Sequence, residues 1–498
     1  MVGLALGQGA CLQFTTFSCE DADACNARSG GVCMSGQCAY PDDACSSGLR
    51  YDEFADAAFA GDCVGGGTTS DGSGGTSSTS VGSLDTTLTA TSLDSGSSVG
   101  AESSSSSGET GEVCGGAGQS CCADGPACAD GLDCMGQACG CVRQIETGDR
   151  HSCAVLVDGT VLCWGANDRG QLGDSLQPFE SAPVSALAVR PSDPIREVRA
   201  TNHTCVRSEQ GNVRCFGAND SGQVDPALAQ PTAPATPAPV TSADHVAAGA
   251  AFTCAADGIS LVCWGANGQS QLTGVDPGPG PASTGTGPVA RLEAGAAFGC
   301  LLQSGNVSCW GANGQGQLAT DPGMTPSLPS PTSMPVADVA DIALGRTHTC
   351  VLTNTATISC WGRNDVGQLG DGSGTQQLAP VAVAWPPEAG TPIAIAAGDQ
   401  HTCAIDDDAA LWCWGSNDSG QLMLEPDMGG NDQYTLVPVH IEVGAGVLDV
   451  AGGVTHTCVR TDTAQVLCWG TNSAGQIGDG TTNYAFEPQP AAIDCGVQ

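Results

Sequence analysis

Seven segments of the chain share one pattern of apolar and polar positions. In CLLQSGNVSCWGANGQGQL, residues 300–318, two short apolar runs flank a Ser-Gly pair, and a Gly-rich polar stretch follows. Short apolar runs separated by turn residues predict two antiparallel β-strands joined by a tight hairpin. The first cysteines of the seven segments recur at steps of 46 to 55 residues. That period is typical of a propeller blade or a solenoid unit, and seven is a common number of blades in a closed propeller.

The two cysteines of each segment are predicted to form a disulfide across the hairpin. A two-residue Ser304-Gly305 turn places Cys300 opposite Cys309, and longer units absorb one extra residue at a turn such as Asp158-Gly159. Opposed residues in antiparallel strands have Cα atoms about 4.5 to 5.5 Å apart, which is within reach of a disulfide. Each bridge would close a loop of about ten residues and contribute roughly 2.5 to 3 kcal/mol. The predicted pairs are Cys153–Cys163, Cys205–Cys215, Cys254–Cys263, Cys300–Cys309, Cys350–Cys360, Cys403–Cys413 and Cys458–Cys468.

The repeated polar letters are interpreted as architecture rather than catalysis. Two residues before the first cysteine stand His151, His203, Phe252, Phe298, His348, His401 and His456. A metal ligand or a general base could not be replaced by Phe, whereas a packed ring could. Asn and Gln recur in all seven units, three and seven residues after the Trp or Phe that follows the second cysteine. Side chains at fixed offsets from turn glycines are expected to satisfy backbone groups of the turn.

Composition places the chain in an oxidising compartment. It has 29 cysteines in 498 residues and no C-x-x-C pair, so disulfides are favoured over zinc sites. The formal charge is −39, and all fourteen cations are Arg, which makes nucleic acid a poor partner. No apolar run of 18 residues exists, so no membrane span is expected. The start, MVGLALGQGAC, could be part of an export signal or precede a lipid anchor at Cys11.

Four regions are expected along the chain. Residues 1–63 form a Cys-rich module, and residues 64–112 form a Ser/Gly/Thr-rich flexible linker without cysteine or aromatic residues. Residues 113–141 form a small Cys-rich, knottin-like module whose six cysteines before Cys141 allow fifteen connectivities. Both modules resemble short Cys-rich parts of large secreted bacterial proteins. Residues 142–498 contain the seven repeats.

The repeat resembles the regulator-of-chromosome-condensation, or RCC1-like, family. The resemblance is carried by HTC and CWG with the following N-x-x-GQ, and by Gly-Asp-Gly in some units, such as Gly370-Asp371-Gly372. Ala200 and Ser270 depart from the usual Gly of the repeat. The resemblance implies an all-β fold, a seven-bladed propeller of four-stranded antiparallel blades. It also implies divergent functions: guanine-nucleotide exchange, β-lactamase inhibition by a secreted bacterial relative, or an interaction platform.

Ring closure is expected to use the C-terminal segment. EPQPAAIDC, ending at Cys495, is predicted to complete the blade begun by residues 142–153, which would bring Cys495 close to Cys141. We therefore predict a Cys141–Cys495 disulfide at the seam of the ring. The cysteine count then leaves one over, assigned as Cys11 and either free or lipidated.

These features predict a secreted or cell-surface, monomeric binding protein that recognises an unknown protein or surface glycan. Recognition would use the connections that differ between blades. Candidate exposed contact residues are Arg169, Arg363, Trp385 and Tyr434. No catalytic residue, metal ligand or cofactor is predicted. The alternatives are nucleotide-exchange activity of the family type, and a propeller hydrolase or lyase, which would need a non-repeated polar cluster in the central channel.

Overall fold

A computed structural model describes residues 32–34, 37–41, 49–51, 133–135 and 138–495, except for gaps at 174, 176, 188–191, 229–231, 239, 241, 259, 273–281, 284–287 and 425–432. The chain divides into two units, residues 1–105 and 106–498. The first contains the antiparallel sheet β1 (Val32–Met34), β2 (Gln37–Pro41) and β3 (Leu49–Tyr51). The linker 64–112, Cys11 and most of both Cys-rich modules lie outside the described residues.

The second unit begins with the hairpin β4 (Asp133–Met135) and β5 (Ala138–Gly140), followed by seven four-stranded antiparallel sheets, the blades. Blades one to four consist of β6 (Val142–Thr147), β7 (His151–Leu156), β8 (Val161–Ala166), β9 (Phe179–Ser185); β10 (Ile195–Ala200), β11 (His203–Ser208), β12 (Val213–Ala218), β13 (Thr232–Pro237); β14 (His245–Ala248), β15 (Phe252–Asp257), β16 (Ser260–Gly265), β17 (Ala282–Ser283); β18 (Arg291–Ala294), β19 (Phe298–Gln303), β20 (Asn306–Ala312), β21 (Ser327–Ser333). Blades five to seven consist of β22 (Val339–Leu344), β23 (His348–Thr353), β24 (Ile358–Gly362), β25 (Gln377–Ala382); β26 (Pro392–Ala397), β27 (His401–Asp406), β28 (Leu411–Ser416), β29 (Tyr434–Ile441); β30 (Val447–Gly452), β31 (His456–Thr461), β32 (Val466–Gly470), β33 (Ala485–Pro490).

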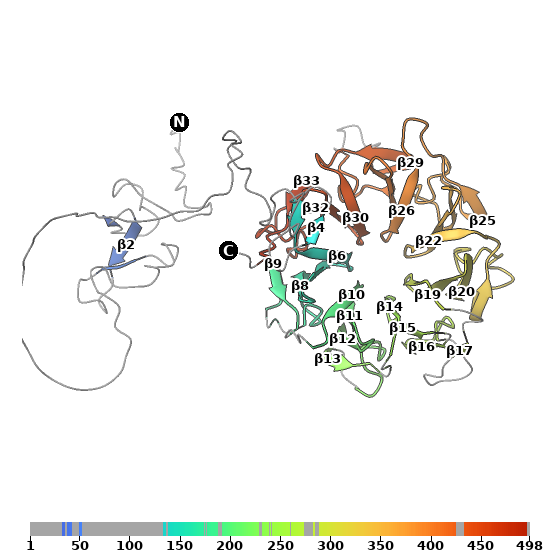
Figure 1. Ribbon diagram of the computed structural model, residues 1–498, viewed down its shortest axis with the longest axis horizontal. Coiled ribbons are helices and arrows are strands. Elements are labelled where there is room, and N and C mark those ends of the chain that lie inside the picture. Colours follow the sequence, from blue (N-terminus) through green and yellow to red (C-terminus); the bar gives the residue numbers. More distant parts are fainter. Residues whose placement is uncertain are drawn as a thin grey trace, which may run out of the picture. The chain divides into compact units, whose positions relative to one another are not determined.

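The blades form one closed ring, so the seven-bladed all-β propeller expected from the repeats is confirmed. The first strand of each blade lies at the centre and the fourth at the rim, as β6 and β9 show (Figure 1). Strand order within every blade follows the sequence, because each strand pairs antiparallel with the next one along the chain.

Disulfides join the second and third strands of all seven blades, in the pairs that the sequence predicts. In each hairpin the two cysteines are direct register partners, such as Cys153 and Cys163, with Cα atoms 4.1 Å apart. The shorter turn of blade four gives the same opposition of Cys300 and Cys309. The hairpin turn therefore absorbs the difference in spacing while the bridge stays in place.

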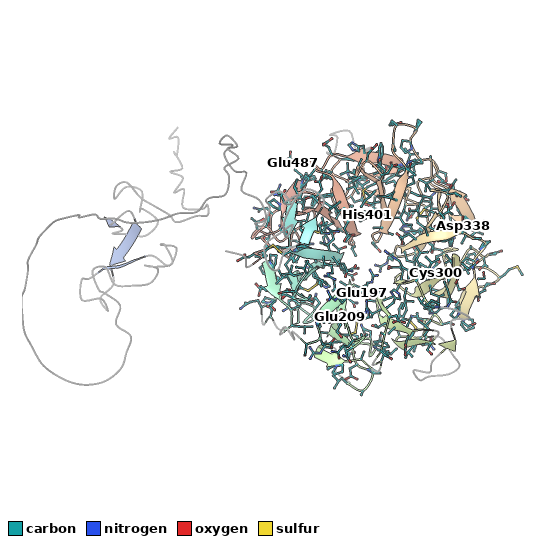
Figure 2. All side chains as sticks on the ribbon, viewed as in Figure 1. Glu197, Glu209, Cys300, Asp338, His401 and Glu487 are labelled. Carbon is teal, nitrogen blue, oxygen red and sulfur yellow. A yellow bond between two sulfur atoms is a disulfide. The ribbon has the colours of Figure 1, made fainter. Side chains whose placement is uncertain are left out.

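The hydrophobic core lies between the blades rather than inside one sheet. Seven buried clusters fill the seven interfaces, and hairpin cysteines contribute to all of them. The large rings after the second cysteine are fully buried there, with Trp361 and Phe216 each at 0% exposure. Figure 2 shows the side chains crowded around the whole ring. Each blade therefore needs its neighbours to bury its two faces.

The predicted strand exchange at the closure is wrong. Strand β33 pairs with β32 as the fourth strand of blade seven, and blade one completes itself with β9. The seam is instead closed covalently, since Cys141 and Cys495 form a disulfide between the segments that flank blades one and seven. Apolar packing also crosses the seam, where Val142 and Trp164 share a cluster with Ile477.

The alternating strand directions create two faces. We call loop face the one that carries the turns between first and second strands, such as residues 148–150, and the loops between third and fourth strands, such as residues 167–178. The opposite hairpin face carries the tips between second and third strands, such as residues 157–160, and the connections between blades. Variable segments of different lengths occur mainly in the third loops and the blade connections.

Candidate functional site

The repeated Asn and Gln side chains fold the loop that leaves each third strand, as the sequence predicts. In blade five, the side-chain oxygen of Asn364 accepts a hydrogen bond from the Leu369 backbone N–H at 3.0 Å. The Gln368 side-chain oxygen accepts one from the Val366 N–H at 3.1 Å. The same two bonds recur in the other six blades. These residues are therefore committed to backbone groups.

The histidines link neighbouring blades through hydroxyl groups. Nε2 of His348 lies 2.9 Å from the hydroxyl of Thr402 in the next blade, and that hydroxyl donates to the Gln368 carbonyl. A hydroxyl that donates its own proton to the carbonyl must accept from the histidine, so Nε2 carries the imidazole proton. The contact recurs for His151, His203, His401 and His456. The histidines are structural and neutral.

Burial lowers the pKa of these histidines, to about 4 for His151 and His401 and about 3 for His203, His348 and His456. A depressed pKa means that the unfolded chain binds the proton more tightly. The stability that each neutral histidine contributes is therefore present above the unfolded value of 6.5 and is lost as the pH falls towards the folded value.

We expect His401→Phe to make the propeller less sensitive to acid. Phe occupies the same position in blades three and four, so the site accepts that ring. Removing one such titration should reduce the fall in unfolding free energy between pH 6 and 4.5 by about 1.4 kcal/mol per pH unit. Denaturant unfolding at several pH values measures this slope. An unchanged slope would contradict the assignment of His401 as a neutral buried group.

A polar cluster that the sequence analysis missed lies in the central channel. The first strands present two channel positions per blade, opposite the first cysteine and two residues before it. Opposite the cysteine stand Glu146, Arg199, Ala247, Glu293, Ala343, Ala396 and Ala451. The earlier position holds Gln144, Glu197, His245, Arg291, Asp341, Ala394 and Asp449. The Asp, Glu and Arg side chains at these positions thus lie on blades one, two, four and five, with Asp449 on blade seven, and most of the positions on blades five to seven hold Ala.

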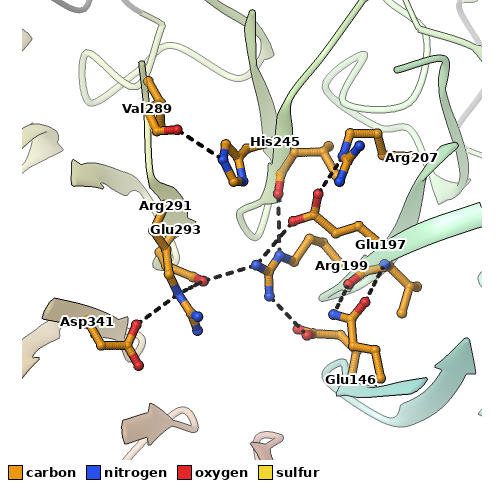
Figure 3. A network of polar contacts seen from close by, with 12 residues as sticks. Glu146, Glu197, Arg199, Arg207, His245, Val289, Arg291, Glu293 and Asp341 are labelled. Carbon is orange, nitrogen blue, oxygen red and sulfur yellow. Dashed lines mark hydrogen bonds and ion pairs between the residues drawn. The ribbon is translucent and has the colours of Figure 1, made fainter. Parts of the chain in front are cut away.

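Arg199 is the centre of this cluster (Figure 3). Its guanidinium contacts Glu146 of blade one at 3.3 Å, and Glu197 and Glu293 at 3.2 Å each. Its Nε also donates to the Val246 carbonyl of blade three at 3.4 Å. One side chain therefore joins the first four blades across the channel, and the small Ala247 leaves space for it.

Further ion pairs extend the cluster around the ring. Arg207 binds the second oxygen of Glu197 at 2.8 Å, and Arg291 joins Glu293 to Asp341 of blade five at 3.0 and 3.1 Å (Figure 3). The channel widens here to a cavity of about 420 Å³. A smaller space of about 120 Å³ opens towards the loop face, beside Arg346 and its partner Asp399.

Burial in the channel shifts the pKa values of three carboxyl groups upwards. The pKa of Glu146 is raised to about 8, because burial outweighs the attraction of Arg199 and because Glu293 and Asp449 add repulsion. Burial likewise raises the pKa of Asp341 and Asp449. In contrast, the pKa of Arg199 lies above its usual value, because three carboxylates surround it and outweigh its burial. Among the described residues, no group of three or more His, Cys, Asp and Glu side chains is arranged to hold a metal ion.

Three of the four predicted contact residues lie on the loop face and keep exposed surface. Arg169 pairs with Asp220 of the next blade at 2.7 Å, Arg363 pairs with Asp365 at 2.6 Å, and Tyr434 is 44% exposed. Trp385, expected to be exposed, is instead partly buried on the hairpin face, where it packs against the core of blades five and six. The connection after Trp385 folds back, so that the indole N–H donates to the Gly390 carbonyl at 3.0 Å.

Exposed apolar side chains gather on the loop face. Of the ten large hydrophobic side chains found exposed in the described part of the chain, seven belong to its loops or to the starts of the rim strands that leave them: Phe179, Leu228, Met324, Leu378, Tyr434, Tyr484 and Phe486. Tyr484 and Phe486 form a ring pair with centroids 4.8 Å apart. The loop of blade six approaches this pair at Gly420, so blades six and seven share one apolar surface.

Comparison with known proteins identifies the repeat. The family described as "Regulator of chromosome condensation (RCC1) repeat" matches residues 142–171, 201–223, 339–368, 393–421 and 447–476 in one form, and 304–352, 359–405 and 408–460 in another. The chain is 30% identical over 155 residues to human E3 ubiquitin-protein ligase HERC2, and 36% identical over 155 residues to the X-linked retinitis pigmentosa GTPase regulator homolog of Caenorhabditis elegans. Each match covers 30% of this chain, but only 3% and 11% of those proteins.

Among solved structures, Prp20p of Saccharomyces cerevisiae is 20% identical with a TM-score of 0.46, and covers 71% of this chain and 78% of its own. The ectodomain of the Arabidopsis thaliana receptor kinase ACR4 is 18% identical with a TM-score of 0.42, and covers 68% and 96%. The family matches show that the chain contains RCC1 repeats, and these lie in six blades of a single seven-bladed, disulfide-stapled β-propeller.

Proposed function

We propose that this chain is a secreted or cell-surface scaffold that binds a protein partner through the loop face of its propeller. Seven exposed apolar side chains on that face, distributed over six of the seven blades, carry the proposal. A rigid ring presenting aromatic side chains beside the exposed Arg169–Asp220 and Arg363–Asp365 pairs has the composition of a protein interface. The eight disulfides of the propeller favour an oxidising compartment for this role.

The roles of the repeated side chains support a binding function rather than catalysis by the repeats. The repeated His, Asn and Gln side chains are engaged in holding turns and blade contacts. No helix in the described part of the chain is long and apolar enough to cross a membrane. One similar protein is itself a binding protein: the structure of Prp20p, the yeast RCC1 protein, is described with its binding to Gsp1p and histones, and a second structure shows it bound to Kap60.

Site-specific photo-crosslinking in the full chain tests the proposal. A photoreactive amino acid at Met324, Tyr434 or Phe486 samples the loop face, and the same residue at Glu209, Thr355 or Thr463 samples the hairpin tips of the opposite face. With surface extract from the source cells, loop-face positions should yield one shared crosslinked protein that hairpin-tip positions do not. Equal labelling from both faces, or labelling from the tips alone, would refute the loop face as the binding surface.

The channel cluster supports a second candidate function, a propeller hydrolase or lyase. It is the non-repeated convergence of carboxyl groups that such an enzyme needs, and Glu146 has a pKa suited to proton transfer near neutral pH. However, the guanidiniums of Arg199 and Arg291 each bridge carboxylates of different blades, so a structural role in holding the ring together is sufficient to explain the cluster. Turnover of a surface polysaccharide that is abolished by Glu146→Gln without loss of folding would favour the enzyme.

A further inference from the structure

A cleft lies on the hairpin face of blade six. Three segments distant in sequence meet there: the connection 385–390, the hairpin 406–412 and the end of strand β29. They enclose a cleft of about 550 Å³ lined by Glu388, Asp406, Asp408, Trp412, Pro438 and His440. The cleft is separate from the channel and lies opposite the loop face.

Two aromatic rings, Trp412 and His440, line the cleft, and Trp385 packs against Trp412. The centroids of Trp385 and Trp412 are 5.9 Å apart, and those of Trp412 and His440 are 5.2 Å apart, with the ring planes tilted in both pairs. Both indole N–H groups are used internally, one by Gly390 and the other by Asp406. What these rings offer to a ligand is therefore their faces and edges rather than hydrogen-bond donors.

Asp406 holds Trp412 and the connection at Gly390 in place through one carboxylate oxygen, while its other oxygen caps the hairpin turn. One carboxylate oxygen accepts the Asp408 and Ala410 backbone N–H groups, which is the turn-capping role that a hydroxyl performs in blades two, five and seven. The other oxygen accepts the Trp412 indole N–H at 2.9 Å and the Gly390 N–H at 3.0 Å. The second pair of bonds ties the indole and the incoming connection together.

The repeat does not require aromatic residues here. Trp412 and His440 are direct cross-strand partners. In the five other blades whose rim strand is described at this register, the partners are Leu162 and Ser185, Arg214 and Pro237, Ser308 and Ser333, Ser359 and Ala382, and Leu467 and Pro490. The blade therefore folds without an aromatic side chain at either position, so the ring pair of blade six is not needed for the fold of the repeat.

The acidic side chains of the cleft favour a cationic ligand. Glu388 and Asp408 are exposed at its edge, and no Arg side chain is among the residues that line it. Carboxylates beside aromatic rings attract an ammonium or guanidinium group by ion pairing and by cation–π contact. Trp412 is only 7% exposed, which suits a compact cation better than the broad platform that a sugar ring needs. We propose that this cleft binds a Lys or Arg side chain exposed on a partner protein.

Peptide titration of the full chain tests this proposal. The probes are Ac-Gly-Gly-Lys-Gly-Gly-amide, its Arg counterpart, and a norleucine counterpart that keeps the shape without the charge. The ¹H–¹⁵N signal of the Trp412 indole should shift saturably with the two cationic peptides and stay unchanged with norleucine. No saturable shift with either cationic peptide, an equal shift with norleucine, or a shift with oligosaccharides alone would overturn it.

Matched variants locate the binding. Glu388→Gln with Asp408→Asn should weaken the cationic peptides about tenfold, whereas Glu487→Gln, which removes an exposed charge from the rim of blade seven, should leave affinity unchanged. Trp412→Leu introduces the residue that blades one and seven carry at this position and should also weaken binding, monitored by calorimetry because the indole is lost. Wild-type affinity in both cleft variants would rule the site out, and loop-face binding would remain untouched, because that surface is elsewhere.

Discussion

Replacing Cys141 and Cys495 together by Ser should lower the free energy of unfolding of the propeller by about 5 kcal/mol, the largest effect expected of any single disulfide. The two residues are 354 positions apart in sequence and enclose all seven blades. The entropy that a bridge removes from the unfolded chain grows with the logarithm of the loop it closes, and reaches about 5 to 6 kcal/mol for a loop of this size. No strand crosses the seam to substitute for the bond, because blades one and seven are each complete.

The hairpin bridge of blade five provides the control. Its two cysteines are 10 residues apart, so Cys350→Ser with Cys360→Ser should cost about 2.5 to 3 kcal/mol by the same reasoning. Both double variants leave no unpaired thiol, which makes denaturant unfolding comparable. A seam variant that loses less stability than the hairpin variant would show that noncovalent packing between blades one and seven suffices to close the ring.

Arg199→Met should lower the free energy of unfolding by about 3 to 5 kcal/mol at neutral pH, because it leaves three buried carboxyl groups without their shared cation. The loss should grow as the pH rises. The pKa of Glu146 is raised from 4.5 to about 8, so the folded protein holds that proton more tightly than the unfolded chain, and stability falls as the pH rises between these values. Without Arg199, no guanidinium would contact ionised Glu146, so its ionisation in the folded protein would cost more free energy.

Denaturant unfolding at pH 6 and pH 9 measures both effects. Arg169→Met serves as the control, since it removes an exposed ion pair whose two side chains are 43% and 53% accessible, and such pairs contribute at most about 1 kcal/mol. A loss below that value for Arg199→Met, or one independent of pH, would mean that water in the channel compensates the carboxylates and that Arg199 does not fasten the ring.

The repeats predicted the propeller because the same sequence pattern occurs in all seven blades. Opposed cysteines, a Gly-turn and a buried ring recur wherever a blade packs against its neighbour, so the same physical demands produce the same letters. The rim strands face solvent on their outer edge and carry no such pattern, as FESAPVS in β9 and AFEPQP in β33 illustrate. For that reason the sequence did not reveal that β33 belongs to blade seven.

The channel cluster and the cleft of blade six escaped prediction for a related reason. Glu146, Arg199 and Glu293 occupy one position of the repeat but differ in kind, and only closure of the ring brings them within contact of one another. The available signal was a charged residue at a first-strand position that four of the seven blades fill with Ala. Trp385 was predicted to be a contact residue. Its ring partner Trp412 lies directly before the second cysteine of its hairpin, so the sequence indicated only an ordinary strand residue there.

Because each blade supplies all four of its own strands, the ring could be opened at any junction between blades without breaking a sheet. Since no strand is lent from one end of the ring to the other, and since the Cα atoms of Cys141 and Cys495 are 5.6 Å apart, a short peptide joining these ends would allow the chain to be reopened between any two blades. Such permuted chains should fold to the same propeller. Folding would then begin at a different blade in each permuted chain, while the loop face and the hairpin face stayed the same.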